Sequence, residues 1–119
     1  MGIKVLVVDD NEDVRRMLDR QMRKTGWEVH FANNGKDGVD EAWNFQPDLI
    51  VMDMHMPERG GHEAVRNLRQ GGYKGKITGL TQTADHSNIE QLTQSGCNFF
   101  LVKPIGRYFV QNLEKMLGV

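Results

Sequence analysis

The sequence is poor in cysteine, in long apolar runs and in any excess of charge. Among its 119 residues it has one cysteine, Cys97, which excludes an internal disulfide and favours a reducing compartment. No apolar run approaches the ~20 residues of a membrane span, and no signal-peptide pattern opens the chain. The net charge is −1, with no basic block typical of a nucleic-acid surface. We therefore expect a cytoplasmic protein with no membrane segment and no direct nucleic-acid binding.

What the sequence does contain is a pair of short apolar runs that end in carboxylates. Residues 49–52 are all apolar and are followed by Asp53, and residues 3–8 are followed by Asp9 and Asp10. Runs of this kind predict strands buried on both faces of a parallel sheet. A loop is expected over 54–58, because Pro57 prevents an immediate helix. An aspartate after one strand is often only a turn residue, but two such strand ends favour a site.

The rest of the chain continues the alternation of strands with helices. Five strands are predicted, at 3–8, 27–32, 49–52, 76–81 and 98–102, each followed by residues with helical spacing. Alternation requires crossover connections, a parallel sheet and helices on both faces. The predicted fold class is therefore α/β, with one domain over 1–119 and a doubly wound five-stranded sheet of order 2-1-3-4-5.

In that order the first and third strands are neighbours, roughly 4.8 Å apart, so Asp9, Asp10 and Asp53 meet. Like charges about 4 Å apart repel by about 4 kcal/mol at an effective dielectric constant near 20. A cluster of carboxylates therefore needs an offsetting cation, and an all-oxygen set of donors suits Mg²⁺. Thr81 ends the fourth strand and Lys103 follows the fifth, so both are expected on the same rim.

Taken in this order, the residues resemble those of receiver (response regulator) domains of two-component and phosphorelay signalling. The resemblance runs from the Asp9-Asp10 pair to Lys103-Pro104 and the closing helix, which is nearly the whole chain. It implies a flavodoxin-like (βα)5 fold and a phosphoprotein switch. Asp53 would accept a phosphoryl group from phosphohistidine on a histidine kinase or a histidine phosphotransfer domain. Such a domain assists its own phosphorylation and dephosphorylation and turns over no external substrate, so we do not expect an ordinary enzyme.

The resemblance also implies a role for each residue of a magnesium site. Asp10 would ligate Mg²⁺ directly, Asp9 would hold it through water, and Asp53 would contribute the phosphoacceptor carboxylate. His55 would ligate through its backbone carbonyl and not through its imidazole.

Three further residues are expected to respond to the phosphoryl group. Thr81 would bind one phosphoryl oxygen and Lys103 would pair with another. Phe100 matches the switch aromatic, whose rotamer follows Thr81. Its movement would alter the face formed by the fourth helix, the fifth strand and the fifth helix, where a downstream protein or an attached output domain binds.

Some positions depart from the usual pattern of these domains. Gln82 stands where a small residue is usual, so it is expected to narrow access to the phosphoryl group or to donate a hydrogen bond to it. His55 and Thr83 flank the route of attacking water, and we hypothesise that they set the lifetime of the phosphorylated state. Leu113 replaces an arginine that supports a charged dimer face in winged-helix regulators, which argues against that dimer. The sequences around Asp53 and Lys103 favour a receiver excised from a hybrid histidine kinase or a multidomain regulator, although a stand-alone protein stays open.

Three other functions fit the same residues less well. A non-phosphorylated receiver-like adaptor would not need the intact acidic set. A phosphohydrolase with an aspartyl nucleophile would need a second carboxylate at position 55, where the sequence has histidine. A flavin carrier of this fold would need a phosphate-binding loop after the first strand, and the acidic run over 9–13 would repel a phosphate.

Overall fold

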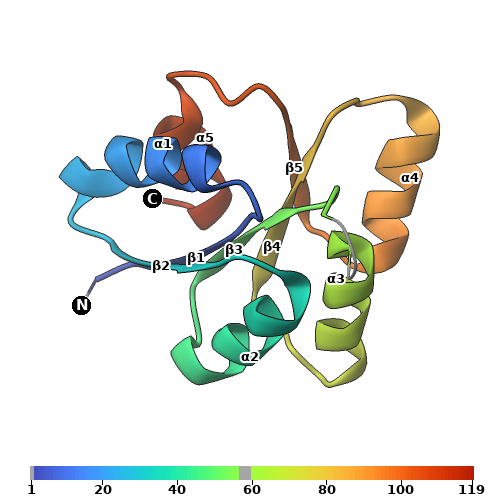
Figure 1. The fold of residues 1–119 in the computed structure, drawn as a ribbon. Helices are drawn as coiled ribbons and strands as arrows, with labels where there is room; N and C mark the ends of the chain where they lie inside the picture. The colour runs from blue at the N-terminus through green and yellow to red at the C-terminus, as the bar shows by residue number, and fades with distance from the viewer. Residues whose placement is uncertain (1, 57–59) are drawn as a thin grey trace.

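The computed structural model describes residues 2–56 and 60–119. Within these ranges five parallel strands form one sheet of order β2-β1-β3-β4-β5 (Figure 1), which confirms the predicted fold class. The strands are β1 (Lys4–Val8), β2 (Glu28–Ala32), β3 (Leu49–Asp53), β4 (Lys76–Thr81) and β5 (Phe99–Val102). The helices are α1 (Glu12–Met22), α2 (Gly35–Phe45), α3 (Gly61–Gln70), α4 (His86–Ser95) and α5 (Phe109–Leu117), with a short 3₁₀ turn, η1 (Arg23–Thr25).

Helices cover both faces of the sheet. Helices α1 and α5 lie together on one face, and α2 and α3 lie on the other (Figure 1). Side chains alternate along the central strand β1, so Val5 and Val7 pack toward α1 and α5, while Leu6 and Val8 pack toward α2 and α3. All four are fully buried. The continuous apolar run in the sequence therefore reflects a strand that is buried on both sides.

Side-chain caps determine where several helices begin. The Asn11 side chain accepts a hydrogen bond from the Val14 amide at 3.1 Å and starts α1. The Asn34 side chain accepts one from the Asp37 amide at 2.8 Å, so α2 starts at Gly35, whereas the sequence predicts a helix from about Lys36. Gly26 predicts the end of the first helix, because glycine is common just after a helix, but α1 ends at Met22 and η1 completes the connection. The Gly26 backbone is left-handed, at a φ of 79°.

Glycines allow two helices to approach the sheet near the carboxyl ends of β3 and β4. A Cβ at Gly61, the first residue of α3, would overlap the carbonyl oxygen of Asp53 and lie 2.8 Å from Met54 Cα. A Cβ at Gly79 in β4 would lie 2.6 Å from Leu92 Cδ2 of α4. Glycine weakens the sequence prediction of this strand, but in the structure the missing Cβ of Gly79 leaves room for the Leu92 side chain.

The structure bears on the predicted loop after β3 and on the position of Leu113 in α5. Of the loop predicted for 54–58, residues 57 and 58 lie outside the described part. Leu113 is fully buried against the sheet, so its identity carries no information about a dimer surface, and the expected absence of that dimer stays a prediction. No helix within the described ranges combines the length and apolar character needed to cross a bilayer.

Candidate functional site

Three carboxylates meet at the carboxyl ends of the two central strands. Asp9 directly follows β1, and Asp53 is the last residue of the neighbouring strand β3. One carboxylate oxygen from each of Asp9, Asp10 and Asp53 lies within 4.8 Å of the others. Asp9 and Asp53 are buried, whereas Asp10 is exposed at the rim. The predicted meeting of these three residues is therefore present in the structure.

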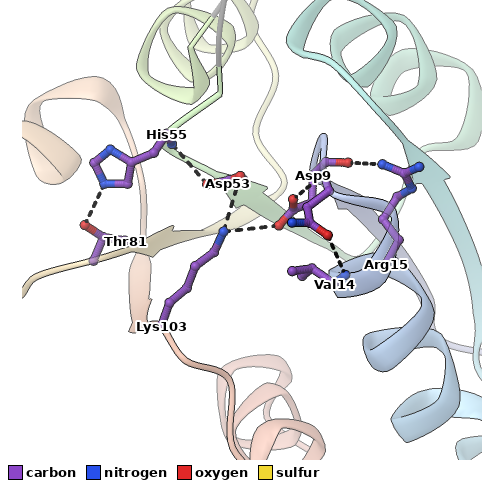
Figure 2. A network of polar contacts seen from close by, with 8 residues as sticks. Asp9, Val14, Arg15, Asp53, His55, Thr81 and Lys103 are labelled. Atoms are coloured by element: carbon purple, nitrogen blue, oxygen red, sulfur yellow. Dashed lines mark hydrogen bonds and ion pairs between the residues drawn. The ribbon is translucent and has the colours of Figure 1, made fainter.

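Lys103 places a positive charge between two of these carboxylates. Its Nζ lies 3.4 Å from Asp9 Oδ2 and 3.3 Å from Asp53 Oδ2 (Figure 2). The residue follows β5, two strands away from β3, so the length of the lysine side chain is needed to reach the centre of the rim. The lysine side chain is only 22% exposed, so solvent screens these ion pairs weakly.

The backbone around Asp9 orients its carboxylate. The Asn11 amide donates to Asp9 Oδ1 at 2.9 Å, and Arg15 Nη1 donates to the Asp9 carbonyl at 2.6 Å. Burial raises the pKa of the Asp9 carboxyl above its usual range, the Asn11 hydrogen bond lowers it, and the charge of Asp53 raises it again. Lys103 opposes that rise but does not cancel it. The pocket therefore holds Asp9 in a well-defined orientation in which its negative charge is poorly solvated.

Asp53 and His55 form a tight turn at the end of β3. The His55 amide donates to Asp53 Oδ1 at 3.0 Å, which leaves Asp53 Oδ2 facing Lys103. The His55 imidazole is exposed, and in Figure 2 its ring points away from Asp53 toward Thr81. His55 Nε2 lies 3.3 Å from Thr81 Oγ1. The sequence argument considered only the backbone of His55 as a ligand and missed this use of its side chain.

Thr81 is the last residue of β4 and is fully buried. Besides its contact with His55, Thr81 Oγ1 donates to the Thr83 carbonyl at 3.2 Å. It also accepts a hydrogen bond from Asn88 Nδ2 of α4. Asn88 was not singled out in the sequence. Its position three residues after the N-cap Asp85 fixes it in the first turn of α4, but only the structure shows that this turn faces the end of β4.

The remaining predicted residues lie around the rim. Gln82 and Thr83 are both exposed, and Thr83 Oγ1 donates to Asp85 Oδ2 at 2.8 Å. Phe100 lies on β5 with 38% of its surface exposed. Within the described residues, no hydrogen bond or ion pair joins Gln82, Thr83 or Phe100 to the three aspartates, so the roles expected for these residues stay predictions.

The donor set fits a hard divalent cation. In the described part of the chain this is the one group of three or more acidic, histidine or cysteine side chains close enough to share a metal ion. All of its side-chain donors are carboxylate oxygens, which Mg²⁺ prefers over nitrogen or sulfur. Lys103 carries one charge against three carboxylates, so the residues themselves leave an excess of negative charge at the rim.

The chain is similar to several known proteins. It is 32% identical over 105 residues to the chemotaxis protein CheY of Thermotoga maritima, covering 87% of this chain and 88% of that protein. It is 34% identical over 112 residues to the CAI-1 autoinducer sensor kinase/phosphatase CqsS of Vibrio cholerae, covering 92% of this chain. The receiver domain of sensor histidine kinase PA1611 from Pseudomonas aeruginosa, solved with a magnesium ion coordinated in its active site cleft, is 29% identical. That structure matches with a TM-score of 0.87, and the match covers 100% of both chains.

The relatives differ in their lengths. The chain spans 16% of the length of CqsS and 22% of the length of another curated relative. The sequence profile of the response regulator receiver domain matches residues 5–114. Because that match covers most of the chain, the protein belongs to the response regulator receiver domain family of two-component signalling.

Proposed function

We propose that the protein is a magnesium-dependent phosphoacceptor switch whose Asp53 receives a phosphoryl group from phosphohistidine. One observation carries the proposal: the buried Asp53 carboxylate lies 3.3 Å from the Lys103 ammonium and within a cluster of two further aspartates. A histidine kinase or a histidine phosphotransfer domain is the expected donor. We infer that residues 1–119 act as one receiver domain, and the relatives are compatible both with a CheY-like protein and with a segment of a sensor kinase.

The reaction is a displacement at phosphorus. A carboxylate oxygen of Asp53 forms a bond to phosphorus as the phosphorus–nitrogen bond of the donor breaks, and the electron pair of that bond returns to the imidazole. The product on Asp53 is an acyl phosphate, which is labile and therefore suits a reversible signal. Catalysis of such a transfer is mostly positioning and charge stabilisation. The His55 amide fixes one Asp53 oxygen, and the Lys103 ammonium is close enough to pair with a phosphoryl oxygen after the transfer.

Asp9, Asp10, Asp53 and the backbone carbonyl of His55 would hold the magnesium ion. When bound, the ion supplies positive charge that offsets the carboxylates and the phosphoryl oxygens. The chain's own part is to hold the donors in place. The Asn11 amide orients Asp9, and the short turn after β3 orients Asp53.

Thr81 and Phe100 would convert phosphorylation into a change of surface. The new phosphoryl oxygens are strong acceptors, and Thr81, which ends the neighbouring strand β4, has a hydroxyl that could turn toward them. Movement of Thr81 would leave room for the Phe100 ring to turn inward. Phe100, Val102 and Tyr108 are exposed on β5 and before α5, which supports a binding face for a downstream protein or output domain here.

Gln82, His55 and Thr83 would control access to the acyl phosphate. All three are exposed on the rim close to the ends of β3 and β4, where water must approach. We propose that they set the lifetime of the phosphorylated state. Apart from assisting phosphorylation and dephosphorylation of its own Asp53, the protein would turn over no external substrate.

The test is phosphorylation by a small acyl phosphate, followed by intact-mass measurement. In the presence of Mg²⁺ the wild type should gain one phosphoryl group, and addition of EDTA should prevent the gain. Asp53→Asn should gain none, whereas Asp40→Asn, which alters an exposed aspartate of α2, should behave as the wild type. A label that persists in Asp53→Asn would contradict the proposal.

A further inference from the structure

Asn88 ties the end of β4 to the first turn of α4. Its backbone amide donates to the N-cap residue Asp85 at 2.8 Å, which holds Asn88 in the helix. Its side-chain Nδ2 donates to Thr81 Oγ1 and also, at 2.6 Å, to the carbonyl of Thr83. A carbonyl can only accept, so the contact with Thr83 identifies the nitrogen end of the amide as the end that faces Thr81.

In these contacts the Thr81 hydroxyl already donates the one hydrogen that it has. A hydroxyl has one hydrogen to donate and two positions at which it accepts. Thr81 Oγ1 donates to the Thr83 carbonyl and accepts from Asn88, and His55 Nε2 lies within hydrogen-bond distance at 3.3 Å. The hydroxyl therefore has no hydrogen left to donate to a phosphoryl oxygen at Asp53. A phosphoryl oxygen can be bound by Thr81 only after the hydroxyl leaves this arrangement.

The groups that contact the Thr81 hydroxyl would still have hydrogen-bond partners after it moves. The Thr83 carbonyl keeps its second donor, Asn88 Nδ2, at 2.6 Å. Asn88 is partly exposed and His55 is exposed, so water can replace the Thr81 hydroxyl for both of them. Release of Thr81 therefore leaves no buried polar group without a partner, and its cost is limited to the hydrogen bonds that Thr81 itself gives up.

We propose that Asn88 is a positioning residue that holds the Thr81 hydroxyl toward α4 and so opposes phosphorylation of Asp53. The inference rests on the proposed function of Asp53, and it assigns a role to a residue outside the set predicted from the sequence. Loss of the Asn88 side chain would remove the hydrogen bond to Thr81 from the unphosphorylated state only, whereas the hydrogen bond to the Thr83 carbonyl would be lost from both states and so would cancel. The phosphorylated state should then form more readily.

Asn88→Ala tests this without disturbing the helix start, because the amide that Asp85 accepts belongs to the backbone. Asn67→Ala is the matched control, since Asn67 is exposed on α3. The first measurement is the side-chain rotamer of Thr81 in the unphosphorylated protein, from three-bond NMR couplings. We expect one rotamer in the wild type and in Asn67→Ala, and averaging between rotamers in Asn88→Ala.

The second measurement is the acyl phosphate concentration that gives half-maximal phosphorylation with Mg²⁺. We expect a value about twofold to tenfold lower in Asn88→Ala, the range expected for one net hydrogen bond, and no change in Asn67→Ala. The role of Asn88 would be overturned if Asn88→Ala kept the single Thr81 rotamer of the wild type. It would also be overturned if the wild type is phosphorylated and Asn88→Ala needs the same acyl phosphate concentration. Failure of the wild type to be phosphorylated would instead contradict the function of Asp53, and the rotamer measurement would still decide whether Asn88 restrains Thr81.

Discussion

Replacement of Lys103 by methionine should destabilise the protein when no divalent cation is present. The ammonium lies 3.4 Å from Asp9 Oδ2 and 3.3 Å from Asp53 Oδ2, and the two carboxylates are almost fully buried. At an effective dielectric constant near 20, one unit charge pair at this separation is worth about 5 kcal/mol before desolvation. Breaking a buried pair typically costs about 3–5 kcal/mol, because the remaining charge is left without a partner.

The lysine side chain is 22% exposed, so water screens the pairs in part and we expect a loss of about 2–4 kcal/mol for Lys103→Met. Methionine keeps an apolar stem of similar length, so the change acts mainly on charge. The assay is urea unfolding at neutral pH in EDTA, followed by circular dichroism. Lys36→Met removes an exposed lysine of α2 and should change the free energy of unfolding by less than about 0.5 kcal/mol.

Added Mg²⁺ should reduce the difference in the free energy of unfolding between Lys103→Met and the wild type. A cation at the aspartates would offset the carboxylate charge that the missing ammonium no longer offsets. A loss in EDTA no larger than that of Lys36→Met would refute the reasoning. It would mean that the ammonium does not stabilise the buried carboxylates.

Further predictions concern the pH dependence of stability, the turn after β3 and the phosphorylated state. Because the folded-state pKa of Asp9 is raised, its stabilising contribution is present below the unfolded value of 3.8 and is lost as the pH rises through the folded pKa. In EDTA, acid titrations followed by urea unfolding should therefore show a weaker fall in stability with rising pH for Asp9→Asn than for the wild type. Gly61→Ala should cost about 1–3 kcal/mol in the same assay, because its Cβ would overlap the Asp53 carbonyl, and an unchanged midpoint would contradict that contact. His55→Ala should speed loss of the phosphoryl group by about tenfold, equal to about 1.4 kcal/mol, by opening the route of water, and Thr83→Ala should do so to a smaller extent. The measurement is the decay of the phosphorylated mass after removal of the donor, and unchanged rates in both variants would contradict these two predictions.

Much of the fold followed from the sequence because its signals are local. The apolar runs ending at Asp9 and Asp53 identified strands buried on both faces, and alternation with helices then left few topologies. The meeting of the aspartates followed from strand order alone. Boundaries were less accurate: the Asn34 cap moved the start of α2, and the chain left α1 at Met22 through a 3₁₀ turn.

What the sequence could not supply were contacts that depend on rotamers and on helix placement. The hydrogen bonds of Thr81 with the His55 imidazole and with Asn88 join three separate elements, and no spacing rule connects them. Leu113 was compared with a dimer-face arginine because it lies ten residues after Lys103 in the sequence. Its burial depends on the rotation of α5 about its axis, which only packing determines.

The most direct test of the central claim is to locate the phosphoryl group on the chain. An acyl phosphate is reduced by borohydride to an alcohol, whereas a phosphohistidine is not, so peptide mass spectrometry after reduction identifies the modified carboxylate. After reaction with a phosphohistidine donor and Mg²⁺, we predict that the reduced residue is Asp53. Reduction at another carboxylate, or a phosphoryl group that resists borohydride and maps to His55, would contradict the account.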